Sequence, residues 1–243
     1  MKWRDPLALI AILLLLWQAM YWVVGDVALT SPVSTFRSLA VMLADPRFWP
    51  HVNETLLAFA QGFAIAVVIG LGIGFLLGAH SMTGEVGEPI LVALYSIPKV
   101  TLYPIILLIV GIGMPAKVAF GAIQGIVPIA LFAMNSIRNL NPVFARTGRV
   151  LRLSPLASAQ RILLPAALPE IVAGIRVGFS LTLVGTLLGE MFGSQRGLGY
   201  LLIQAMNLHN MRTIMSVTLL LVIFAASVNA VLLAIDRRLR ARA

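Results

Sequence analysis

The chain has 243 residues, of which 60% are hydrophobic and only 11% are charged. Soluble domains carry about 25% charged residues, so this composition indicates a membrane protein with several spans. The absence of cysteine excludes disulfides, thiolate metal sites and cysteine nucleophiles. The net charge of +9 does not point to nucleic acid, because the lysines and arginines of a membrane protein gather on its cytoplasmic side for topological reasons.

Six stretches are apolar over the roughly 20 residues that a membrane-spanning helix needs. The first begins after Lys2 and Arg4 and carries Trp17 and Trp22 toward its outer end. Aromatic residues there are typical of a membrane interface and favour a span over a cleaved signal peptide. The sequence therefore predicts an all-α membrane protein with one transmembrane domain over residues 1–243 and spans at 7–24, 53–79, 89–110, 116–137, 170–192 and 214–235.

The segments between these spans are expected to be mostly loops. Residues 25–51 contain three prolines as breakers, and Asn53 is predicted to cap the second span. Residues 80–88 are predicted to be a cytoplasmic connection, and Pro98 with Lys99 interrupts the third span. Residues 193–212 are too polar to span and are predicted to form a short amphipathic helix.

The distribution of positive charge predicts that both termini are cytoplasmic. In that orientation the outer segments hold five lysines and arginines, which are Arg37, Arg47, Lys117, Arg196 and Arg212. The inner segments hold eleven, which are Lys2, Arg4, Arg138, Arg146, Arg149, Arg152, Arg161, Arg237, Arg238, Arg240 and Arg242. The inner connection 80–88 carries Glu85 and Glu88 without a basic residue, but acidic residues count for little in this rule.

The chain lacks the motifs of an enzyme that works alone. It has no G-x-x-x-x-G-K-[ST] loop to hold ATP phosphates and no His-Glu-x-x-His zinc motif. The glycine-rich run 70–78 lies inside a span and is interpreted as helix packing. Catalysis by this chain is therefore not expected, no metal or cofactor site is predicted, and uphill transport would need a gradient or a partner protein.

A basic, polar segment at residues 138–169 separates the fourth and fifth spans. Residues 142–153 have helical composition, and 156–164 are predicted to form a second short helix before Pro165. Ser154 is a predicted N-cap and Pro155 the first helical residue, which makes a helix-turn-helix. Leu151, Leu153 and Leu156 lie around its bend. An apolar bend among arginines suits a docking site for a soluble partner; the alternative is a loop whose arginines only enforce topology.

This segment resembles the cytoplasmic loop of the permease subunits of ATP-binding-cassette importers, which reads E-A-A-x3-G-x9-I-x-L-P. Anchoring the pattern on residues 162–165 places its E-A-A at Arg146, Thr147 and Gly148, and its glycine at Arg152. The surrounding residues 149–155 and 164–171 resemble the nitrate, sulfonate and taurine branch of these importers. So do the motifs at 97–100, 103–104, 111–113 and 197–200, and the likeness covers roughly residues 50–240.

Two positions depart from the family pattern. Arg146 replaces the family's glutamate and reverses its charge, so the family's ionic contact is not carried over to this position. Arg152 replaces the glycine, and if the bend needs a left-handed residue, arginine costs about 1 kcal/mol or more relative to glycine.

The resemblance implies the rest of a transport system in a bacterial cytoplasmic membrane. Two copies of the permease, or two related permeases, would form the pathway, and two cytoplasmic ATPases would bind the loops and hold the ATP and Mg²⁺. A periplasmic or lipid-anchored binding protein would deliver the solute. The solute class stays open among nitrate, alkyl sulfonates, taurine-like zwitterions and pyrimidine precursors. The ATPase-coupling residues would be Arg146, Gly148, Arg149, Leu151, Arg152, Leu153, Ser154, Pro155, Leu156 and Pro165.

Lys99 and Arg176 are charged residues inside predicted spans. Such residues usually face a bundle interior or an aqueous cavity, and a cationic pair would suit an anionic solute. The alternative is that Lys99 extends its amine to the interface and Arg176 pairs with a carbonyl or a lipid headgroup. Both are candidates for the translocation pathway.

The fifth span carries a glycine stripe, because Gly174, Gly178, Gly185 and Gly189 fall within about 60° of one another on a helix. A stripe of this kind permits close helix approach, either as static packing or as a surface along which helices slide. Glu190 follows at the outer end, where it could contact a binding protein, gate the mouth, or serve as an interfacial carboxylate.

Two other classes of protein compete with this interpretation. A gradient-driven secondary transporter would show inverted repeats and a buried acid for ion coupling, and no repeat is recognised here. A passive channel or a membrane scaffold would use the basic loop only as an anchor.

Overall fold

The computed structural model describes residues 4–25 and 28–240, and every regular element in these ranges is helical. Short 3₁₀ and π segments, Lys99–Leu102 and Ala159–Leu163, precede α5 and α9 respectively. The helices are α1 (Arg4–Val24), α2 (Pro32–Ala44), α3 (Trp49–Gly78), α4 (Ser81–Ser96), α5 (Tyr103–Val110), α6 (Met114–Arg138), α7 (Pro142–Val150), α8 (Pro155–Ser158), α9 (Leu164–Gly193), α10 (Leu198–Asn207) and α11 (Met211–Arg240).

Helix α6 is the centre of the bundle, and it packs between α3 and α9. Glycines make the α3–α6 contact close: a Cβ built on Gly74 would lie 2.5 Å from Ala133 Cβ and 2.6 Å from Ala130 O. Gly70 and Gly78 face α6 in the same way, with backbone atoms of α6 within 3 Å of the added Cβ. The interpretation of the run 70–78 as helix packing is confirmed for Gly70, Gly74 and Gly78, whereas a Cβ added to Gly72 would meet nothing within 4 Å.

The described residues contain four helices long and apolar enough to cross a membrane. In chain order they are α3, α6, the continuous helical segment 160–193 that ends with α9, and α11 up to Leu239. Helix α4 and the segment Lys99–Val110 would make a fifth span, broken by a bend of 80° at Ile97 and Pro98. Helix α1 is shorter in its apolar part, Ala8–Val24. The chain is thus an all-helical, multi-pass membrane protein, and the count of six spans stays a prediction.

Two predicted loops are helical instead. Residues 25–51 contain α2, in which Pro32 occupies the first turn behind the N-cap Ser31. Proline is tolerated there because the first amides of a helix have no partner within it. For the same reason Pro50 lies in the first turn of α3, which begins at Trp49, so Asn53 is not the cap. The prediction that residues 80–88 form a loop is also wrong, because α4 starts at Ser81.

The basic segment differs from the prediction at both of its helices. Helix α7 ends at Val150 rather than 153. The second helix does not stop before Pro165: α8 and the π segment run into α9, with Pro165 in its first turn and Pro169 inside it. The fifth span therefore starts before residue 170. The short helix expected within 193–212 is present as α10.

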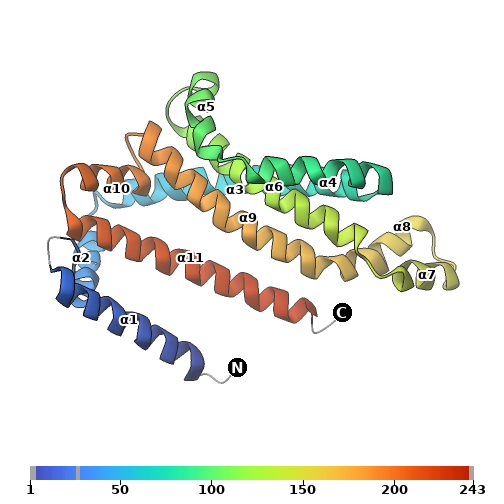
Figure 1. The fold of residues 1–243 in the computed structure, drawn as a ribbon, viewed down its shortest axis with the longest axis horizontal. Helices are drawn as coiled ribbons and strands as arrows, with labels where there is room; N and C mark the ends of the chain where they lie inside the picture. The colour runs from blue at the N-terminus through green and yellow to red at the C-terminus, as the bar shows by residue number, and fades with distance from the viewer. Residues whose placement is uncertain (1–3, 26–27, 241–243) are drawn as a thin grey trace.

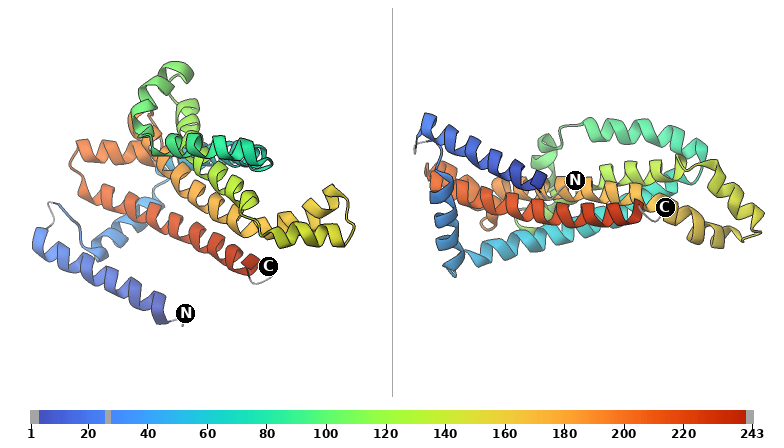
Figure 2. Two further views of the ribbon diagram at one scale, coloured as in Figure 1. Left: turned by 45° about the vertical axis from the view of Figure 1, so that its right-hand side comes forward. Right: turned by 90° about the horizontal axis from the view of Figure 1, so that it is seen from below.

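Helix α11 runs toward the end of the molecule that carries α7 and α8, and α1 begins near the middle of its length, whereas α2 and α10 lie at the opposite end (Figures 1 and 2). We call these the loop end and the α10 end. The prediction that both termini and the basic segment lie on the cytoplasmic side stays a prediction, and Lys2 and Arg242, which contributed to it, lie outside the described residues.

Candidate functional site

The turn between α7 and α8 is built around a left-handed residue. Arg152 has a φ of +50°. Arg152 N donates to Arg149 O and Leu153 N donates to Gly148 O, both at 3.0 Å. This pair of bonds is the Schellman arrangement, in which glycine is favoured at the left-handed position because a Cβ costs energy there. The family pattern has glycine at the position of Arg152. The left-handed backbone at this position explains why glycine is favoured there.

The second half of the turn follows the sequence prediction. Ser154 caps α8, since its Oγ accepts a hydrogen bond of 3.3 Å from Ala157 N. The side chains of Pro155 and Leu156 lie outside the described part of the chain. Gly148 is buried, and a Cβ added to it would overlap Ser158 Oγ. The two arms of the turn are therefore in direct contact.

The bend presents apolar and basic side chains to the surroundings. Val150 is 81% exposed and Leu151 60% exposed, while Leu153 is half-buried. Arg146, Arg149 and Arg152 are also exposed, and Pro165 is exposed where α9 begins. Of the three leucines expected around the bend, Leu151 is exposed, Leu153 is half-buried and the side chain of Leu156 lies outside the described part of the chain.

The two intramembrane cations differ in their surroundings. Lys99 is buried at 8% exposure, and its Nζ donates to Tyr95 O at 3.3 Å and lies 5.2 Å from the centre of the Tyr95 ring. Its amine is thus held by the last turn of α4. Arg176 is half-buried on α9, and the structure does not bring it together with Lys99 in any described contact.

The glycine stripe of α9 faces α6. Cβ atoms added to Gly174 and Gly178 would overlap Phe132 and Ile129, and one on Gly185 would lie 3.0 Å from Phe120 O. The close helix approach predicted from the stripe is confirmed.

Polar groups cross the same α6–α9 contact. The hydroxyls of Thr182 and Thr186 are buried without a hydrogen-bond partner among the described residues. They lie against Gly125 and Gly121 respectively. The contact thus has a polar stripe on α9 that continues one turn further to Glu190.

At the α10 end, a buried ionic cluster joins α3, α6 and α9. Lys117 and Glu190 are each fully buried, with Nζ and Oε1 3.7 Å apart. Lys117 Nζ also donates to Glu54 Oε1 at 2.9 Å, and Thr55 Oγ1 donates to Glu190 Oε2 at 2.8 Å. Buried charges are tolerated only when they are paired and hydrogen-bonded, and here each one is.

The cluster also holds four consecutive residues that lead into α10. Lys117 Nζ donates to Arg196 O at 3.2 Å, and Gly197 N donates to His51 Nδ1 at 3.2 Å. Leu198 N donates to Thr55 Oγ1 at 2.8 Å, and Gly199 N donates to Glu190 Oε2 at 2.9 Å. These amides start α10 and have no partner within the helix, so the side chains act as its cap. We call the set of residues 51, 54, 55, 117, 190 and 196–199 the outer clasp.

The outer clasp corrects the expectation for Glu190 and shows what the sequence interpretation missed. Glu190 is not an interfacial carboxylate, because it is fully buried. Lys117 was counted only as an outer charge, and Glu54, Thr55 and His51 were not singled out. The sequence offered one indication of such a cluster. Glu54 and Lys117 each lie in the first turns of an apolar helix, where a charge without a partner is energetically costly.

A second ion pair lies at the loop end. Arg138 Nη1, in the last turn of α6, is 2.6 Å from Glu88 Oε2 on α4. This contact gives Glu88 a basic partner that the local sequence 80–88 lacks.

The comparisons with known proteins agree with the geometry. Residues 66–243 match the family described as binding-protein-dependent transport system inner membrane component. A protein named as an aliphatic sulfonates transport permease of Bacillus subtilis is 27% identical over 84% of this chain and 74% of its own length. The taurine transport system permease protein of Escherichia coli is 24% identical over 83% of this chain and 78% of its own. The nitrate import permease protein of Synechocystis is 28% identical over 83% and 76%.

Among solved structures, a chain of the MetNI methionine ABC transporter in an inward-facing conformation aligns with a TM-score of 0.69. It shares 24% identity and covers 80% of this chain and 98% of its own length, so the likeness concerns the fold. The family match covers most of the chain and includes the basic segment, α9 and the outer clasp residues of α6 and α9. The chain therefore belongs to the binding-protein-dependent transport system inner membrane components, the permease subunits of ABC importers, and resembles their nitrate, sulfonate and taurine branch.

Proposed function

We propose that this permease works as a homodimer, with six spans per copy and both termini in the bacterial cytoplasm. Two cytoplasmic ATPase subunits dock on the loop end and hold the ATP and Mg²⁺, and a periplasmic or lipid-anchored binding protein delivers the solute at the α10 end. ATP binding draws the two ATPases together, and their different affinity for two states of the permease shifts its equilibrium.

The observation that carries this proposal is the exposed bend between α7 and α8. Val150 and Leu151 are large apolar side chains that project from the loop end of a membrane protein, between exposed arginines. Exposed apolar groups rimmed by polar residues commonly mark protein–protein contacts. Arginines around them favour an acidic surface on the partner through charge complementarity. With Arg146 at the position of the family's glutamate, we assign the anchoring to the apolar residues.

The transported solute is proposed to be a small anion or zwitterion, as the names of the sulfonate, taurine and nitrate relatives suggest. In this proposal Lys99 and Arg176 supply positive charge along the pathway. Gly178 and Gly185 set the α6–α9 spacing, and Glu190 holds the outer end of the pathway in place through the outer clasp.

The docking is tested by replacing Leu151 with glutamate in the full chain expressed with its ATPase. A buried apolar anchor contributes enough that its loss weakens a complex by about tenfold or more. We therefore expect L151E to lose the co-purifying ATPase and the solute-stimulated ATP hydrolysis in liposomes. The matched control is L208E, since Leu208 is 71% exposed at the α10 end. If L151E retains the ATPase as tightly as L208E does, the bend is not the docking site.

A further inference from the structure

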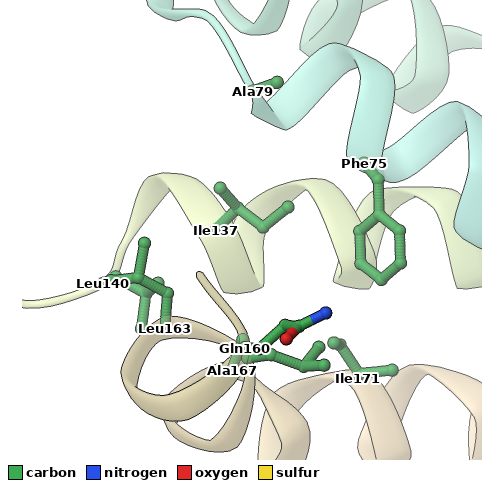
Figure 3. A pocket seen from close by; sticks show the side chains of 9 residues that line it. Phe75, Ala79, Ile137, Leu140, Gln160, Leu163, Ala167 and Ile171 are labelled. Carbon is green, nitrogen blue, oxygen red and sulfur yellow. The ribbon is translucent and has the colours of Figure 1, made fainter. Parts of the chain in front are cut away.

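An apolar hollow of about 410 Å³ lies at the loop end between α3, α6 and the start of α9. Its walls are formed by Phe75 of α3 and Ala79 just after that helix, Ile137 of α6, and Ala167 and Ile171 of α9 (Figure 3). The π segment that links α8 to α9 contributes Gln160. The hollow is open to the surface, so a molecule from the surroundings can enter it.

Gln160 is the polar group in this hollow. It is exposed, and its amide forms no hydrogen bond with another described residue. Figure 3 shows the amide directed into the hollow, toward Phe75 and Ile171. One amide at the edge of an apolar space suits a ligand with a long apolar body and a single polar group near its end.

The depth of the hollow fits the boundary between acyl chains and headgroups. Helix α3 has 30 residues and is thus about 45 Å long at 1.5 Å per residue, against a hydrocarbon core of about 30 Å. The last turns of such a helix reach the headgroup region. Phe75 is three residues from the end of α3, and Ile137 is one residue from the end of α6. At this depth the hollow is adjacent to acyl chains on the side of the bilayer centre and to ester carbonyls on the side of the headgroups.

Positive charge lies beside the hollow. Arg161 follows Gln160, is exposed, and forms no ion pair with a described carboxylate. It lines a neighbouring hollow of about 360 Å³ on the other side of the π segment, together with Phe144. Arg138 follows Ile137 and is paired with Glu88. The guanidinium group of Arg161, which is unpaired among the described residues, is complementary to a lipid phosphate.

From this hollow, the unpaired Gln160 amide and the adjacent Arg161, we propose that the hollow binds one acyl chain of an anionic phospholipid. Gln160 donates to the ester carbonyl, and Arg161 lies near the phosphate. The bound lipid fills the space between the bundle and the π segment, so it supports the junction through which the basic loop joins α9. In the proposed orientation this lipid lies in the cytoplasmic leaflet, whereas lipid binding itself does not depend on the transport function.

The experiment uses the full chain in phosphatidylcholine nanodiscs that contain a small fraction of phosphatidylglycerol with a photoreactive diazirine near the carboxyl end of one acyl chain. After irradiation, mass spectrometry maps the cross-linked residues. A phosphatidylcholine probe with the same acyl chain measures headgroup preference. We expect cross-links of the phosphatidylglycerol probe to concentrate on Phe75, Ile137 and Ile171.

Two variants test the site itself. A79W fills the hollow from its exposed rim and should abolish the concentrated labelling. Q160L removes the amide and should weaken labelling by roughly threefold to tenfold, the effect of one lost hydrogen bond. The control L108W places the same ring on α5, where Leu108 is 87% exposed and outside the hollow, and should change nothing.

Each of the following results would overturn the proposal. One is labelling spread evenly over the apolar helices, or equal labelling by the two probes. The second is unchanged labelling in both A79W and Q160L. The third is labelling that disappears once the ATPase or a second permease copy is bound, because a protein would then occupy the hollow. A loss of ATPase binding without a change in labelling would instead count against the proposed docking and leave the lipid site in place.

Discussion

Replacing Lys117 with methionine removes the central cation of the outer clasp. The substitution keeps an unbranched stem of four atoms but deletes the ammonium group that contacts Glu54, Glu190 and the carbonyl of Arg196. Glu190 would then be a fully buried carboxylate that retains only its hydrogen bonds from Thr55 and Gly199. Removing one partner of a buried ion pair typically costs about 3–5 kcal/mol, because the other charge is left unpaired.

We therefore expect K117M to lower the free energy of unfolding by about 3–5 kcal/mol, measured by reversible unfolding of the purified chain in mixed micelles with far-UV circular dichroism. The double variant K117M/E190Q removes both buried charges and should recover about 1 kcal/mol or more of that loss. An exposed pair provides the control: Arg47 and Asp45 are 93% and 48% exposed in their side chains, and R47Q should change stability by at most about 1 kcal/mol.

The reasoning would be refuted if K117M and R47Q had the same stability, since the buried cluster would then contribute no more than a surface pair. It would also be refuted if K117M/E190Q were less stable than K117M. In that case the carboxylate of Glu190 would not depend on Lys117, and its hydrogen bonds alone would hold the start of α10.

The remaining predictions concern glycine positions. G178L should destabilise the bundle by about 1–3 kcal/mol or more and abolish solute uptake, because its side chain would overlap Ile129 on α6; G72L, whose added Cβ meets nothing within 4 Å, should retain both stability and uptake. Normal uptake by correctly inserted G178L would contradict this account of the α6–α9 contact. R152G should stabilise the α7–α8 turn by up to about 1 kcal/mol, since φ is +50° there, whereas R149G, inside α7, should cost about 1 kcal/mol. Thermal unfolding monitored by tryptophan fluorescence measures both, and a loss of stability in R152G would show that the arginine side chain makes a compensating contact.

Local features were predicted well because the residues that decide them are neighbours in the sequence. Ser154 caps α8 because the amide it bonds is three residues away. The stripe from Gly174 to Gly189 was visible because helical geometry brings such residues to one face, whatever that face meets.

Prolines were the main source of error in the boundaries. Pro32, Pro50 and Pro165 were interpreted as breakers or helix ends, yet each lies in the first turn of a helix. Proline stops a helix in its interior and is favoured at its start, so the residue alone does not say on which side the helix lies.

The sequence by itself determined the membrane class, the family, the positions of most helices and the glycine faces, because hydropathy and helical periodicity are properties of contiguous residues. The tertiary structure alone decided the outer clasp, in which Lys117 meets Glu54 across 63 positions and Thr55 meets Glu190 across 135. It also decided that Arg152 is left-handed and that a hollow opens beside Gln160. Such features depend on which helices pack together and in what register, and no short stretch of the chain specifies that.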